Sequence, residues 1–160
     1  MFERIIAPLD GSRLSSHALP YATAIARKFG GEVILVRVVM QPALGYVPQP
    51  AGMLNPVAVN MLAGQAEQRE VHSVAHAKRY LANQVKRLNG QGVNVSAHVL
   101  EGEAGPVIID LAQKTSASMI VMMSHGRGWF KRAIMGSVTD EVIRHSRVPV
   151  LVIRPKETGK

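Results

Sequence analysis

The chain has 160 residues, 47% of them hydrophobic and 19% charged, which is the size of one domain with enough apolar material for a buried core. It holds no cysteine, which excludes a disulfide framework, a thiol nucleophile and a cysteine-bound metal. No apolar run approaches the roughly 18 residues of a membrane span, and the amino-terminal residues lack the apolar region of a signal peptide. We therefore expect a cytoplasmic protein.

The charge is basic and unevenly distributed. The formal net charge is +8, and residues 123–160 hold eight basic and three acidic side chains. Such a bias suits a phosphate-bearing partner, either a nucleotide or a nucleic acid. A basic surface that only keeps the protein in solution has the same composition, so charge alone leaves both interpretations open.

The amino-terminal part of the chain alternates strand and helix patterns. Residues 5–9 form a short apolar run that predicts a strand ending at residues 10–12. The next helix has to begin near Leu19 or kink there, because Pro20 has no backbone N–H to donate. Residues 33–39 are almost all aliphatic and predict a strand covered on both faces. Five apolar residues at helical spacing predict one buried stripe on the first helix: Leu14, Ala18, Tyr21, Ile25 and Phe29.

The middle of the chain is less regular. Residues 41–64 carry four prolines and three glycines without a clear period, which predicts a long flexible connection with some helix near its end. A second helix follows and closes at residues 89–90. Residues 93–99 alternate apolar and polar side chains, which predicts a half-buried strand towards the edge of a sheet. The apolar face of the second helix contains Val74, Ala77, Leu81, Val85 and Leu88.

The carboxyl-terminal part repeats the alternation. Pro106 suits the first turn of a helix, and residues 119–123 form a fully apolar strand. Residues 136–137 open a further helix, in which Asp140 completes a variant of the capping box. The last strand covers residues 148–153. The helix that contains Pro106 is expected to bury Ile108, Leu111 and Ala112.

This order predicts an α/β fold with one five-stranded parallel sheet and helices on both faces, because strands that alternate with helices need right-handed crossovers. One domain over residues 1–155, followed by a tail at 156–160, accounts for the chain. Ligands in such sheets bind beyond the carboxyl ends of the strands, at the point where the strand order reverses. That rule brings together Asp10, Val38 and the loop that starts at Ser124.

The loop over residues 124–137 has the properties of a phosphate-binding loop. Gly126 lets backbone amides approach an anion, and Gly136 and Ser137 lie at a helix start, where free amides and the helix dipole favour phosphate. Arg127, together with nearby basic residues, supplies countercharge. The loop is neither a Walker A nor a GxGxxG sequence, and a surface loop followed by a capped helix explains the same residues.

Other candidates have plainer explanations beside the functional ones. Asp10 either accepts hydrogen bonds from a ribose or holds its own turn. His125 follows a serine, but no acid is placed to orient it. His72 and His76 have metal-ligand spacing without a third ligand. The aromatic pair at residues 129–130 either stacks on bases or packs on protein. The methionines of the fourth strand are core residues unless a ligand reaches them.

Taken in order, residues 5–12, 124–138 and 147–152 resemble the universal stress protein family over essentially the whole chain. The resemblance implies a Rossmann-like fold of the adenine nucleotide alpha-hydrolase type. It also implies a homodimer through the last strand, residues 148–153. Pro149 fits an edge strand, because it lacks an amide donor.

Members of the family that bind ATP resemble G-x-x-G, nine residues, then G-[ST]. Gly126, Gly136 and Ser137 match this pattern, but Met123 stands in place of the first glycine. Its side chain either crowds the sugar or points into the core and leaves its amide available. Ser118, where many relatives have aspartate, is a second departure, expected to affect loop structure more than the ligand.

By the same resemblance, adenosine is surrounded by the first and second strands, with Asp10 towards the ribose. The methionines at the end of the fourth strand line the pocket floor. The phosphates meet backbone amides and the Ser137 hydroxyl. The full set of residues assigned to the nucleotide is Pro8, Asp10, Val38, Met122, Met123, Gly126, Arg127, Gly136, Ser137 and Val138.

Three functions compete at this point. The first is a dimeric stress-response regulator that binds ATP, ADP or AMP, with or without Mg²⁺, and has at most slow hydrolysis because no general base is evident. The second is a stress protein that binds no nucleotide and acts through protein partners, an idea motivated by Met123. The third is nucleic-acid binding, motivated by the basic carboxyl-terminal quarter.

Overall fold

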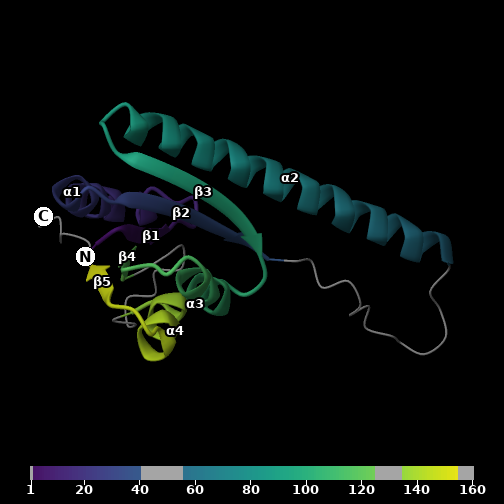
Figure 1. The fold of residues 1–160 in the computed structure, drawn as a ribbon. Coiled ribbons are helices and arrows are strands. Elements are labelled where there is room, and N and C mark those ends of the chain that lie inside the picture. The colour runs from purple at the N-terminus through teal and green to yellow at the C-terminus, as the bar shows by residue number, and fades with distance from the viewer. Residues whose placement is uncertain (1, 41–55, 125–134, 155–160) are drawn as a thin grey trace, which may run out of the picture.

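The computed structural model describes residues 2–40, 56–124 and 135–154, and for residues 56–72 only the course of the helix (Figure 1). Five strands form one parallel sheet in the order β3-β2-β1-β4-β5, which confirms the predicted fold class. The strands are β1 (Arg4–Pro8), β2 (Glu32–Val39), β3 (Asn94–Glu101), β4 (Met119–Met123) and β5 (Val150–Ile153). The helices are the short η1 (Ser15–Ala18), α1 (Leu19–Phe29), α2 (Pro56–Asn89), α3 (Ala104–Lys114) and α4 (Ser137–His145).

The sheet separates two apolar layers. Successive side chains of a strand point to opposite faces, so the buried strands supply both layers. In β4, Val121 and Met123 join the cluster with α1 and α2, while Ile120 and Met122 join the cluster with α3 and α4. Figure 1 shows the same division, with α3 and α4 together on one side. A sheet covered on both faces explains why the central strands are apolar throughout.

The first helix begins where its proline predicts, but its buried face differs from the predicted stripe. Pro20 lies in the first turn of α1, directly after the turn of 3₁₀ helix in η1. Tyr21 and Phe29 are 45% and 47% exposed. The rest of the predicted stripe is confirmed, because Ala18 is buried and Leu14 and Ile25 pack against the same core cluster. The buried residues of α1 are Leu19, Ala22, Thr23 and Ala26.

The second helix is longer than predicted. α2 begins at Pro56, so the helix expected near the end of residues 41–64 covers residues 56–64, and residues 41–55 lie outside the described structure. The predicted inward face is confirmed, because Ala77, Leu81 and Leu88 are buried. Its 34 residues span about 51 Å, and its amino-terminal half runs past the sheet (Figure 1). None of the described helices is both long and apolar enough to cross a membrane.

The carboxyl-terminal elements follow the prediction with two corrections. β3 lies at one sheet edge as expected, and α3 buries the predicted residues. β5, at the other edge, begins at Val150 rather than at residue 148. The capping box of α4 does not form, because Gly136 is the cap residue and Asp140 binds Arg144, with 2.8 Å between Oδ2 and Nε. An i,i+4 pair within the helix thus replaces the expected contact to its start.

Candidate functional site

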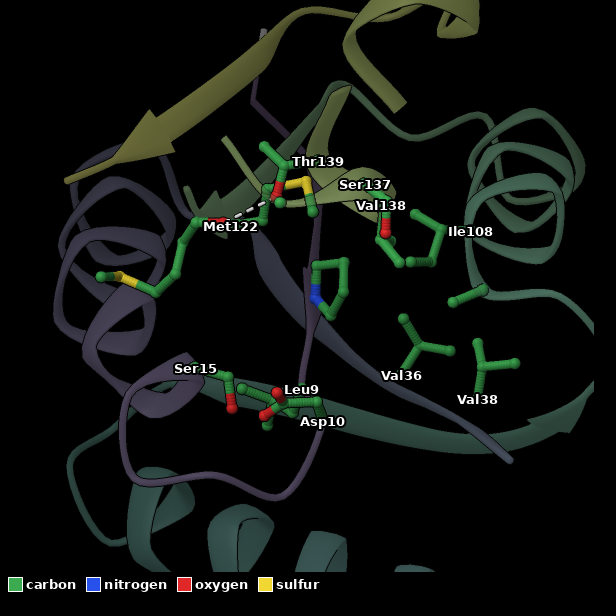
Figure 2. A pocket seen from close by; sticks show the side chains of 14 residues that line it. Leu9, Asp10, Ser15, Val36, Val38, Ile108, Met122, Ser137, Val138 and Thr139 are labelled. Atoms are coloured by element: carbon green, nitrogen blue, oxygen red, sulfur yellow. Dashed lines mark hydrogen bonds between the residues drawn. The ribbon is translucent and has the colours of Figure 1, made fainter. Parts of the chain in front are cut away.

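A pocket of about 290 Å³ opens at the carboxyl ends of β1, β2 and β4 (Figure 2). The chain order reverses between β1 and β4, so the pocket lies at the switch point of the sheet, as predicted. Its lining consists of Pro8, Leu9, Asp10, Ser15, Val36, Val38, Ala104, Ile108, Met122, Met123, Gly136, Ser137, Val138 and Thr139. One wall is apolar, and the first residues of α4 lie beside it, next to Ile108 (Figure 2).

Asp10 combines the two roles that its position allows. One carboxylate oxygen, Oδ1, accepts a hydrogen bond from the Ser12 amide at 2.8 Å, as in a turn aspartate. Asp10 also lines the pocket, beside Ser15 in Figure 2. The Ser15 hydroxyl donates to the Ser12 carbonyl at 3.0 Å, and Gly11 adopts φ +80°. The turn is thereby held by its own hydrogen bonds while it presents an acidic group to the pocket.

Met123 borders the pocket without filling it. Its side chain is 4% exposed and packs in the apolar cluster that contains Leu19 and Ala22 of α1. Its carbonyl oxygen accepts a hydrogen bond from the Thr139 hydroxyl at 3.0 Å (dashed in Figure 2). Of the two alternatives for this residue, the structure therefore shows the side chain directed into the core. Met122, on the opposite face of β4, joins the other apolar cluster.

The start of α4 is anchored to the end of β4. The Gly136 amide donates to the Ser124 carbonyl at 2.7 Å, and Gly136 caps the helix in an extended conformation. Gly136 has no side chain with which to cap the first turn, and the residues of that turn line the pocket, so the positive end of the helix dipole lies beside it. Ser137 is exposed and adds a hydroxyl. This arrangement is suited to an anion such as a phosphate.

The apolar wall contains residues that the sequence interpretation did not select. Val36 precedes Val38 by two residues, so the period of a strand places both on one face of β2. Ala104 and Ile108 come from α3, and only the packing of α3 against the sheet brings them to the pocket. No local pattern marks them as pocket residues, because they read as an ordinary buried helix face.

Most of the predicted site residues meet at this pocket. Those found there are Pro8, Asp10, Val38, Met122, Met123, Gly136, Ser137 and Val138. Gly126 and Arg127 lie outside the described residues, as does the aromatic pair at 129–130. Within the described part of the chain, no three His, Cys, Asp or Glu side chains are grouped to hold a metal ion.

Ser118, the second departure from the family pattern, lies far from the ligand end of the sheet. It directly precedes β4, and its hydroxyl accepts a hydrogen bond from the Glu3 amide at 3.1 Å. Its own amide donates to the Arg4 carbonyl at 2.8 Å. The serine therefore ties the beginnings of β1 and β4 together, which agrees with the expectation of a structural effect.

A parallel sheet with a ligand-sized pocket at its switch point defines a Rossmann-like α/β protein. The sequence model of the universal stress protein family matches residues 1–154, so the chain belongs to that family. Universal stress protein MJ0531 from Methanocaldococcus jannaschii is 30% identical over 159 residues, covering 98% of this chain and 85% of the relative. The solved structure of protein MJ0577 has a TM-score of 0.80 at 26% identity, covering 99% of each chain.

Two further solved structures share the fold and hold nucleotides. A universal stress protein in complex with cAMP has a TM-score of 0.65 at 18% identity, covering 96% of this chain and 97% of the other. A universal stress protein from Archaeoglobus fulgidus in complex with dAMP has a TM-score of 0.62 at 21% identity, covering 96% and 98%. At these identities the likeness extends to the fold alone.

Proposed function

We propose that this chain is a cytoplasmic, homodimeric stress-response protein that binds an adenine nucleotide in the pocket between β1, β2 and β4. The observation that carries the proposal is the direction of Met123, whose side chain packs in the core and leaves room beside the helix start of α4. The pocket thereby offers an apolar wall for a base and a positive helix end for phosphate. Family members that hold cAMP and dAMP support the same ligand class.

Each part of the nucleotide has a matching part of the pocket. The base lies against Val38 and the apolar wall, and the ribose hydroxyls donate to the Asp10 carboxylate. The phosphates accept hydrogen bonds from the amides of the first turn of α4 and from the Ser137 hydroxyl. Gly126 and Arg127 complete the phosphate contacts in this proposal.

Binding rather than turnover is the proposed activity. Among the described residues that line the pocket, Asp10 is the only titratable side chain, and the proposal places it at the ribose. Hydrolysis needs a group that activates water next to the terminal phosphate. The protein therefore reports the level of adenine nucleotides and turns them over slowly at most.

Acid extraction of the freshly purified protein, followed by titration calorimetry with ATP, ADP and AMP with and without Mg²⁺, tests this function. We expect about one adenine nucleotide per chain in the extract or a saturable binding heat. Ser137→Ala should weaken ATP about tenfold, because one hydrogen bond to a charged phosphate is lost. Ser73→Ala, an exposed serine on α2, is the matched control. A clean extract together with no heat at millimolar nucleotide would overturn the proposal.

The alternative function, a stress protein that binds no nucleotide, was suggested by Met123, which replaces a glycine of the ATP-binding motif. Because that side chain lies in the core, it no longer argues against a nucleotide. The nucleic-acid alternative depends on residues 129–130 and on a basic segment of which a large part lies outside the described structure. The pocket at the switch point therefore favours the nucleotide over both.

A further inference from the structure

A buried arginine lies beside the turn that carries Asp10. Arg37 is 8% exposed, and alternation along β2 directs it to the sheet face opposite Val36 and Val38. A Cβ atom added to Gly11 would lie 2.7, 2.8 and 2.9 Å from its Nη1, Cζ and Nη2 atoms. Because these three distances are nearly equal, the face of the guanidinium lies over the space that a side chain at residue 11 would need.

The same guanidinium touches α2. Its Cζ atom lies 5.4 Å from the centroid of the Tyr80 ring, which is within the range of a cation–π contact. The ring keeps the planar guanidinium in place. A lysine has no planar group and could not make the same contact. Arg37 therefore connects the long helix to the residue that directly follows Asp10.

Several polar groups act on the Tyr80 hydroxyl. Burial is the main cause that raises the pKa of Tyr80, and the neighbouring Ser15 hydroxyl lowers it. The Asp10 carboxylate raises this pKa further, while the Arg37 and Arg87 guanidiniums lower it. Asp10 and Arg37 thus act on the same hydroxyl, with opposite sign, in a cluster that reaches the pocket through Ser15.

We propose that Arg37 is a positioning residue for the sugar subsite: its guanidinium, held by Tyr80, supports Gly11 and fixes the direction in which Asp10 presents its carboxylate to ribose hydroxyls. The inference rests on the proposed nucleotide function and deepens it. A buried guanidinium is costly to keep unless it performs a fixed task among polar neighbours. Its task here is the selection of a ligand with free ribose hydroxyls over one without them.

Calorimetry with two ligands, ATP and 2′,3′-dideoxy-ATP, tests this role. We expect the wild type to prefer ATP, and Arg37→Met to reduce that preference about tenfold while the affinity for the dideoxy ligand stays within about twofold. Arg37→Lys should restore part of the preference, because it keeps the charge but not the plane. Arg87→Met, which removes an exposed arginine near the same tyrosine, is the matched control and should leave the preference unchanged.

The outcomes separate this inference from the function on which it rests. If the wild type binds neither ligand, the proposed function fails. If it binds both equally, or if Arg37→Met weakens both by the same factor, nucleotide binding stands and the positioning role is overturned. Should Arg37→Met not fold, Tyr80→Leu keeps the arginine but removes its support, and it should reduce the preference in the same direction. An unchanged preference in that variant would also overturn the role.

Discussion

Met123 illustrates how the direction of a side chain can outweigh its identity. The family motif has glycine at this position, which made a clash with the sugar one of two expectations. The alternation along β4 directs Met123 to the α1 side, where it is 4% exposed. A methionine at this position therefore contributes to the core and costs the pocket little space.

Replacing Met123 by glycine should harm the fold without improving the site. The change removes a buried side chain, so we expect a loss of about 2–5 kcal/mol in the free energy of unfolding, measured by urea denaturation. The affinity for ATP should not rise, because the side chain does not occupy the sugar position. Met123→Leu conserves volume and should cost less than about 1.5 kcal/mol. A gain in ATP affinity in the glycine variant would contradict this account.

The ionisation of Tyr80 should be visible in the pH dependence of stability. Burial raises its pKa above the ordinary value of 10.0, so the folded state favours the neutral hydroxyl. That contribution is fully present below about pH 10 and is lost as the pH rises through the folded-state pKa. Unfolding by urea between pH 8 and 11 should therefore show a steeper loss in the wild type than in Tyr80→Phe. Tyr21→Phe, at an exposed position, is the control, and parallel curves for wild type and Tyr80→Phe would refute the idea.

At the scale of elements, the pocket depends on how α4 is tied to β4. Among the described residues, the Thr139 hydroxyl donates to the Met123 carbonyl and the Gly136 amide donates to the Ser124 carbonyl. Both acceptors are carbonyl groups at the end of β4, beside the pocket. The position of the helix start, and with it the proposed phosphate subsite, follows from these two contacts.

Thr139→Val tests the first contact. The change keeps the shape but leaves a buried carbonyl without its donor, so we expect a loss of about 1–2 kcal/mol in unfolding free energy. Thr23 provides a control, because it is equally buried at 3% but its hydroxyl bonds only within its own helix. Thr23→Val should cost clearly less in the same denaturation experiment. If both variants lost the same unfolding free energy, the hydrogen bond between α4 and β4 would contribute no more to stability than a bond within one helix.

The elements also show what the sequence can predict. Strands β1, β2 and β4 and the inward face of α2 were predicted because burial leaves a strong local pattern. The predicted stripe of α1 was wrong at Tyr21 and Phe29, because the helix buries the small residues Ala22 and Ala26 in their place, and local spacing fits both faces. Some helix was expected near the end of residues 41–64, but its start at Pro56 was not, because glycine and proline in that segment obscure a weak helical pattern.

The residues of the candidate site also fall into those that the sequence predicts and those that it does not. Asp10, Gly136 and Ser137 carry local signals, namely a strand end and a helix start, and the parallel order of the strands predicts that they meet. Ala104, Ile108 and Arg37 reach the site or its support only through tertiary packing. A sequence without a structure shows an arginine in an apolar strand but not the glycine against which it lies.

At the scale of the whole molecule, the sheet has two edges, and β5 forms the shorter one (Figure 1). The carbonyls of Pro149 and Ile153 accept hydrogen bonds from the β4 side. Because donors and acceptors alternate along a parallel strand, the backbone groups of Val150 and Val152 point away from β4. β5 is the last strand of the described sheet, and pairing of these groups with a second copy is the proposed route to a homodimer.

Val152→Pro tests whether the chain dimerises through the edge of β5 or through another surface. Proline removes the outward N–H of β5 but leaves the ladder to β4 intact, so pairing through this edge should fail while the fold persists. We expect light scattering to give twice the 17.3 kDa of one chain for the wild type and a single-chain mass for the variant. Val152→Thr keeps both the N–H and the β-branch, and it should remain dimeric. A proline variant that still dimerises would move the interface to another surface. A monomeric wild type would show that the edge of β5 is not used between copies, and the pocket would then have to act without a partner copy.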